Sequence, residues 1–200
     1  MPVYRTDKLL TYLSEHTEAF LDKAVSEWQT LPHSSFSQTA ADKWSANQCL
    51  AHLNSYGHYY LPQIENAIHI AKQAGSTPAD TFTAGWLGNY FTKLMLTDAS
   101  GKPVKKMSAP KDHTPQVQED SHKVIAEFIE QQEKLLELLD KAKEIDMNNS
   151  KVPISIAKFI KLKLGDTLLF LIAHNYRHIQ QAIRALNADN NLKHFRLEKI

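Results

Sequence analysis

The sequence contains few of the residues that cross-link chains or interrupt helices. Its 200 residues include one cysteine, Cys49, together with six glycines and eight prolines. A single cysteine excludes a disulfide within the chain and fits a reducing compartment, so we expect a cytoplasmic protein. The low glycine and proline content disfavours a turn-rich β structure and favours helices.

The sequence also lacks long apolar runs and a strong excess of either charge. It has no run of 18 apolar residues, so we expect no membrane span. Its first residues, MPVYRTDKLLTYLSEH, lack the apolar core of a signal peptide. The formal net charge is +1, which argues against a broad nucleic-acid-binding surface. These absences leave a soluble globular protein as the expected class.

Apolar residues at helical spacing predict four long helices and one short one. Ser45 and Gln48 fit a capping box at the start of the second long helix, and Asp166 is a reasonable cap for the last. The long helices are expected over residues 5–29, 46–72, 117–144 and 167–188, and the short helix within residues 84–96.

The connection between the second and third long helices sets the expected topology. It covers about residues 75–116, which is long enough to cross a whole bundle, so these two helices need not be antiparallel neighbours. We therefore expect an all-α four-helix bundle domain over residues 1–188. A polar, loosely packed tail is expected over residues 189–200.

Two histidines one turn apart stand in the last helix, in the stretch LIAHNYRHIQQAIRAL. By helical spacing His174 and His178 share one surface, and His52 lies at the edge of the inward face of the helix over residues 46–72. Three imidazoles from two helices can meet a single divalent ion, and three protein ligands leave open positions for substrate. Periodicity alone leaves two other interpretations open, which are buried core histidines and histidines at a solvated edge.

Several further polar residues have both a functional and a structural interpretation. Tyr56 and Tyr60 share the inner face with His52, where they either orient substrate or simply pack. His16 either supports a metal ligand or contacts substrate, or it lies at the edge of the core. His122 either faces the same end of the bundle or lies at the edge of the core. Asn175 is a candidate to hold a histidine in one tautomer, and Gln181 is a candidate to contact a metal-bound group or a backbone carbonyl. Cys49 either approaches the metal or is a small buried apolar residue. The last candidates form either a lid over the cavity or a simple cover of the bundle; they are Trp86, Tyr90 and Phe91.

Three stretches, in this order, carry a resemblance to a known family. They are KWSANQCLAHLNSYGHYY, with a histidine eight residues after Trp44; KKMSAPKDHTP in the long connection; and LKLGDTLLFLIAHNYRHIQQAIRAL, with H-x-x-x-H-x-x-Q. Together they span most of the chain, which resembles the DinB-like (YfiT/DinB) superfamily of metal-dependent enzymes.

The resemblance implies a bundle of up-down-down-up topology and a metal held by His52, His174 and His178. It further implies a homodimer and a small-molecule substrate, with a low-molecular-weight thiol as partner in the members that are transferases. The metal expected is Zn or Ni, with Fe or Mn as alternatives.

Two functions from different classes follow. The first is a metal-dependent enzyme, either a thiol-dependent S-transferase or a hydrolase, and the second is a non-catalytic metal- or ligand-binding bundle. Asn175 follows His174, so the H-E-x-x-H glutamate of classical zinc proteases is absent and that kind of hydrolysis is disfavoured. Thiol transfer needs less help from a general base, because a metal-bound thiol is already deprotonated.

Overall fold

The computed structural model describes residues 1–39, 44–116 and 119–200, and most of the chain is helical. The predominance of helices predicted from the sequence is confirmed. The helices are α1 (Thr6–Lys23), α2 (His33–Phe36), α3 (Ala46–Gln73), α4 (Trp86–Met95), α5 (Ser121–Ala142) and α6 (Leu164–Ala185), with a π-helical turn at Ala24–Trp28 and 3-10 turns at Lys111–His113 and Leu197–Lys199.

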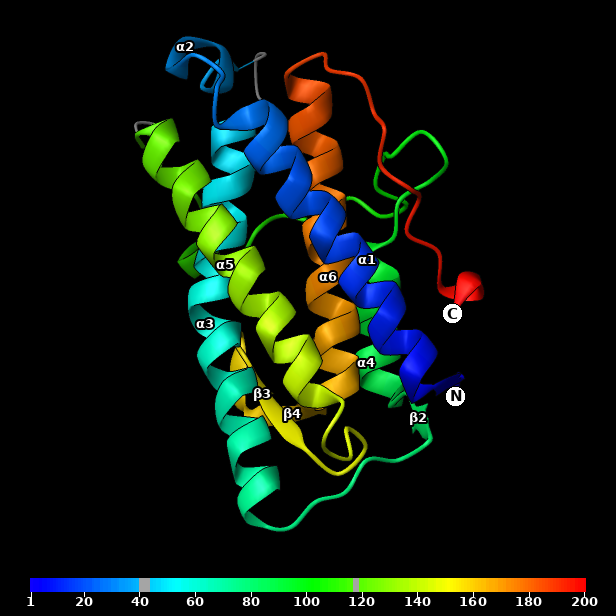
Figure 1. Ribbon diagram of the computed structural model, residues 1–200. Helices are drawn as coiled ribbons and strands as arrows, with labels where there is room; N and C mark the ends of the chain where they lie inside the picture. The colour runs from blue at the N-terminus through cyan, green and yellow to red at the C-terminus, as the bar shows by residue number, and fades with distance from the viewer. Residues whose placement is uncertain (40–43, 117–118) are drawn as a thin grey trace.

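The four long helices α1, α3, α5 and α6 lie side by side (Figure 1). Helix α3 packs against α5 and α6, and α1 packs against the same two helices. The apolar residues that predicted the α5 helix face this interior, where Ile125, Phe128 and Leu135 are buried. The predicted start of this helix at residue 117 lies outside the described residues.

Helix α6 is enclosed on every side, which the sequence did not indicate. Between Leu164 and Ile183 every side chain except that of Gln181 is buried, and the helix contacts α1, α3 and α4. A helix that is apolar around most of its circumference is stable only when other elements surround it. The polar residues of α6 are therefore held in the interior, where each needs a partner.

Two small antiparallel sheets accompany the helices and were not predicted. Strands β1 (Val3–Arg5) and β2 (Thr81–Thr83) form one, and β3 (Lys151–Ile154) and β4 (Ala157–Lys163) form the other. In β3 the buried Val152 and Ile154 alternate with less buried residues, as the two-residue period of a strand requires. In β4 Leu162 is the one buried residue. The hairpin leads directly into α6 and contacts α3.

The predicted caps had different outcomes. At the start of α3 the Gln48 N–H donates to Ser45 Oγ at 3.1 Å, and the Ser45 N–H donates to Gln48 Oε1 at 3.0 Å, so the capping box is confirmed. Asp166 as the cap of the last helix is wrong, because α6 begins at Leu164. The buried Asp166 carboxylate instead accepts from the Gly85 N–H at the start of α4, with distances of 3.1 and 3.0 Å.

The segment after α6 packs more closely than predicted. Phe195 is buried, and its ring lies 5.4 Å from the ring of Tyr12, 5.0 Å from that of His16 and 6.1 Å from that of Tyr176. The Arg196 N–H donates to the Tyr12 hydroxyl. The prediction of a loosely packed tail is wrong, because Phe195 packs this otherwise polar segment against α1.

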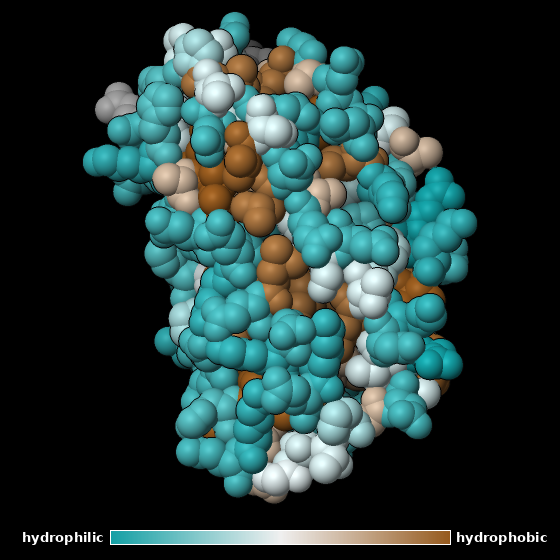
Figure 2. All heavy atoms as spheres, viewed as in Figure 1, coloured by the Kyte–Doolittle hydropathy of each residue, from teal (hydrophilic) through white to brown (hydrophobic). Residues whose placement is uncertain are grey.

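Hydrophilic residues cover most of the face seen in Figure 2, and apolar residues show between them. Among the described residues, no helix is both long enough and apolar enough to cross a membrane.

Candidate metal centre

The first residue of the candidate centre, His52, lies in the second turn of α3. The capping box fixes where this helix starts and therefore where His52 stands. The imidazole is buried, and its Nδ1–H donates to the backbone carbonyl of His113 at 2.6 Å. Because a carbonyl oxygen only accepts, the proton of the neutral ring lies on Nδ1 and Nε2 carries a lone pair.

The other two residues, His174 and His178, lie one turn apart on α6. Both are buried, and their ring centroids are 4.7 Å apart. His178 Nδ1 lies 3.1 Å from Gln181 Oε1, an acceptor that holds the ring proton on Nδ1. The sequence proposed Gln181 as a residue that touches a metal-bound group or a backbone carbonyl, whereas in the structure it orients a histidine.

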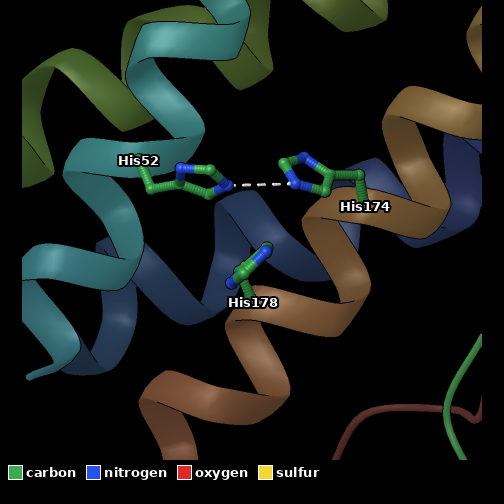
Figure 3. Close-up of side chains that lie close together, drawn as sticks. All are labelled: His52, His174 and His178. Atoms are coloured by element: carbon green, nitrogen blue, oxygen red, sulfur yellow. Dashed lines mark hydrogen bonds between the residues drawn. The ribbon is translucent and has the colours of Figure 1, made fainter. Parts of the chain in front are cut away.

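The structure brings the three imidazoles together, as Figure 3 shows. His52 Nε2 lies 3.2 Å from His174 Nε2, and one nitrogen from each ring falls within 4.8 Å of the others. Two nitrogens bound tetrahedrally to one zinc ion stand about 3.3 Å apart, given Zn–N bonds of about 2.05 Å. The spacing of His52 and His174 fits such an ion, and one nitrogen of His178 lies within 4.8 Å of theirs.

Burial keeps the three imidazoles neutral. It lowers the pKa of His52 to about 4, against the opposing effect of the hydrogen bond to the His113 carbonyl. Burial also lowers the pKa of His174 and His178 well below the usual value, and the nearby positive charge of Arg177 acts in the same direction. At pH 7 the cluster therefore offers neutral nitrogen donors, which is the form that binds metal.

The polar atoms of the cluster are incompletely satisfied by the protein. Among the described residues, His174 Nδ1 is buried and has no hydrogen-bond partner. His174 Nε2 lies 3.2 Å from the lone pair of His52 Nε2, the hydrogen-bond contact that Figure 3 marks with a dashed line. A divalent ion in place of the shared proton would be bound by both Nε2 atoms, with the His174 proton on its unpartnered Nδ1, so the donor set fits such an ion. The role of the three residues as ligands remains a prediction.

His113 was missed by the sequence analysis, although its segment was among the stretches that carry the family resemblance. Besides its carbonyl contact to His52, its Nδ1 lies 2.8 Å from Ser55 Oγ, and its ring lies 4.1 Å from that of Tyr56. The residue thus fastens the long connection to α3 beside the cluster. Helical periodicity carries no signal for such a contact, because His113 lies outside the long helices.

A cavity of about 1100 Å³ opens onto the three histidines. Tyr56 and Tyr60 line it, and the ring of Tyr56 lies 4.3 Å from that of His174. The Tyr60 hydroxyl accepts from the Ser155 N–H, so this residue has a structural partner. Other lining residues include Trp44, Phe91, Met95, Ile154, Leu162, Phe170, Lys102, Lys106, Arg177 and Arg184.

Several other candidates lie away from the cluster. His16 is packed among Tyr12, Tyr176 and Phe195, and burial lowers its pKa to about 4. His122 is exposed in the first turn of α5.

The remaining candidates pack against other side chains, line the cavity or lie on the surface. The Asn175 side chain donates to Gln132 Oε1, and Cys49 is fully buried, which raises the pKa of its thiol. Phe91 lines the cavity, whereas Trp86 and Tyr90 are exposed.

Comparison with known proteins adds one finding. The model of the DinB superfamily matches residues 5–182, a range that contains all three histidines. Comparison with curated proteins and with solved structures gave no match.

Proposed function

The chain belongs to the DinB superfamily, and from this premise we propose that it is a metal-dependent enzyme whose divalent ion is held by His52, His174 and His178. The observation that carries the proposal is the convergence of three buried, neutral imidazoles at the wall of a large cavity. Zn and Ni are the metals we favour, since both accept imidazole nitrogen readily, with Fe or Mn as alternatives.

The proposed architecture is a single four-helix bundle domain over residues 1–188, with up-down-down-up topology and a long crossover between its second and third helices. The side-by-side packing of α1, α3, α5 and α6 supports it. We further propose that the protein is a cytoplasmic homodimer.

When bound, such an ion acts as a Lewis acid that lowers the pKa of a coordinated water or thiol. The residues of this chain orient the donors: the His113 carbonyl fixes the tautomer of His52, and Gln181 fixes that of His178. Tyr56 lies against His174 and faces the cavity, where its hydroxyl is available to a substrate. Burial raises the pKa of Tyr56 to about 12, so it is a hydrogen-bond donor at neutral pH.

The cavity wall supports transfer to a thiol over general-base hydrolysis. Among the described residues that line it, none is an aspartate or glutamate that could take a proton from water. A low-molecular-weight thiol would need no such base, because an ion held by His52, His174 and His178 would lower the pKa of the thiol. We therefore propose an S-transferase in which the sulfur of a small thiol forms a bond to an electrophilic carbon. The bond from that carbon to its leaving group breaks, and the leaving group and the thiol proton are released to solvent.

The test is elemental analysis of protein purified without a polyhistidine tag. We expect about one metal ion per chain in the native protein and a loss of metal in His52→Ala and His174→Ala. His122→Ala is the matched control, because this histidine is exposed, and it should keep the metal. Metal retained in His174→Ala would overturn the proposed ligand set.

Activity is then tested by supplying the metal-loaded protein with small thiols and 1-chloro-2,4-dinitrobenzene. Thioether formation that is lost in His174→Ala supports an S-transferase. A full complement of metal without turnover for any thiol would identify a non-catalytic metal-binding protein instead.

A further inference from the structure

The charged residues that line the cavity are all of one sign. Lys102, Lys106, Arg177 and Arg184 contribute to its wall, and no acidic residue does so among the part of the chain that the structure describes. The chain as a whole is nearly balanced, with 23 lysines and arginines against 22 aspartates and glutamates. The concentration of positive charge is therefore a property of this cavity and not of the composition.

Arg177 is the strongest indication of an anion site among these residues, because it is a buried cation without a counter-ion among the described residues. Its side chain is 6% exposed, and its guanidinium donates to the carbonyls of Leu94 at 2.9 Å and Lys105 at 3.0 Å. Carbonyl oxygens satisfy N–H groups but leave the positive charge uncompensated. Within the described residues Arg177 forms no ion pair, and arginine is rarely this buried without one.

Arg184 lies about two turns further along α6, is partly buried, and also donates to a backbone carbonyl. Its Nη1–H donates to the carbonyl of Gly101 at 2.6 Å. Burial lowers the pKa of Arg184, and the nearby carboxylate of Asp98 acts in the opposite direction. Among the described residues the two side chains form no ion pair. Asp98 is committed to its own turn, where its Oδ1 accepts from the Ser100 N–H, the Ser100 hydroxyl and the Lys102 N–H.

The remainder of the wall is apolar. Phe170 stacks on His174 with ring centroids 5.8 Å apart, and Ile154 and Leu162 of the β3–β4 hairpin continue this surface. One part of the cavity is thus suited to an apolar body and another to negative charge.

We propose that the cavity binds an amphipathic organic anion whose negative group lies against Arg177 and Arg184 and whose apolar body lies against Phe170, Ile154 and Leu162. This inference rests on the proposed function in taking the cavity as the substrate site. The anion supplies the counter-charge that the buried guanidinium lacks. Its middle faces the two histidines of α6, because His174 and His178 lie between Phe170 and Arg184 along that helix. Carboxylate and phosphate groups share the chemistry required, since both accept paired N–H donors from arginine.

The experiment compares two fluorescent probes that share the N-phenylnaphthylamine body and differ by one sulfonate group. 1-Anilinonaphthalene-8-sulfonate carries a negative group, and N-phenyl-1-naphthylamine is its neutral counterpart. We expect one saturable site per chain that binds the sulfonate at least about tenfold more tightly than the neutral probe, with a preference that weakens as salt rises. Equal affinities for the two probes would overturn the proposal.

Substitutions in the cavity wall test which side chains cause the preference for the negatively charged probe. Arg184→Gln should weaken sulfonate binding about tenfold and leave the neutral probe unaffected, while Arg184→Lys keeps the charge and most of the affinity. Lys102→Gln combined with Lys106→Gln removes two exposed charges of the wall and should weaken the sulfonate only. The matched control is Lys8→Gln with Lys123→Gln, which alters net charge equally at exposed sites outside the cavity wall. Sulfonate binding that is unchanged in both cavity variants would contradict the proposal.

Displacement of the sulfonate probe identifies the anionic group. Octanoate alone, octyl phosphate alone or both should compete, and octanol should not; displacement by octanol as effective as by the two anions would count against the charge argument. Metal content is measured on the same samples. A cavity that prefers anions in protein without metal would refute the proposed enzyme and uphold this inference, whereas metal-loaded protein without an anion preference would do the reverse.

Discussion

Replacing Asp166 with asparagine should remove a specific pH dependence of folding. Its buried carboxyl accepts from the Gly85 N–H and so ties α4 to α6. Burial raises its pKa from 3.8 to about 6, and this exceeds the opposing effects of the Gly85 hydrogen bond and of nearby Lys163. The folded state therefore holds a proton that the unfolded chain releases.

The sign and size of the effect follow from this difference. Protonation of Asp166 favours folding, so its contribution is fully present below about pH 4 and is lost as the pH rises through about 6. A difference of about two pKa units corresponds to about 3 kcal/mol, of which about 2 to 3 kcal/mol falls between pH 4 and pH 7. The free energy of unfolding of Asp166→Asn relative to that of the native protein should rise by this amount over the same range.

Urea unfolding followed by circular dichroism, at half-unit steps from pH 4 to pH 7, measures this difference. Comparing the two proteins cancels the titration of the histidines, which they share. Asp22→Asn is the matched control, since this carboxyl is exposed, and its difference from the native protein should stay within about 0.5 kcal/mol throughout. A difference between Asp166→Asn and the native protein that does not change with pH would refute the assignment of a buried, raised-pKa carboxyl.

Three further outcomes are expected. Ser45→Ala removes one half of the capping box of α3 and should cost about 1 kcal/mol in urea unfolding, whereas an unchanged midpoint would mean that the cap does not set this helix start. Phe195→Ala should cost about 3 kcal/mol or more by the same assay, because the ring is fully buried against Tyr12 and His16, and a loss below 1 kcal/mol would contradict close packing of the tail. A chelator should lower the melting temperature of the native protein by stripping a ligand of the folded state, and His174→Ala should not respond; equal responses would argue against the three-histidine centre.

The sequence predicted those features of the fold that depend on local patterns. Apolar spacing located the long helices, and the Ser45–Gln48 pair located the start of α3, because a capping box is satisfied within four residues. The spacing of four residues on a helix correctly predicted that the two histidines of α6 lie on the same face. The same rule placed His52 at an inward position, so the meeting of the two helices was the one non-local step.

The features that were missed depend on contacts between distant segments. Asp166 lies near the start of a helix, and its local sequence predicted a helix cap. Its partner is instead the Gly85 N–H, which lies 81 residues earlier. His113 contacts His52 across 61 residues from a segment with no helical period. The β3–β4 hairpin is short and lies between two helices in the sequence. The lysines of β4, which are Lys158, Lys161 and Lys163, do not keep the two-residue period of a strand, so the local pattern did not indicate one.

The proposed centre and the proposed anion site constrain each other through charge. Imidazoles are neutral ligands, so a divalent ion held by His52, His174 and His178 keeps its full charge, and Arg177 adds another positive charge beside His178. Repulsion between like charges is several times stronger in a partly buried site than in water. An anion in the cavity offsets both charges at once, and because coupling between two ligands is reciprocal, metal and anion each tighten the binding of the other. A cavity wall whose described residues include no carboxylate therefore suits a substrate that brings its own negative charge.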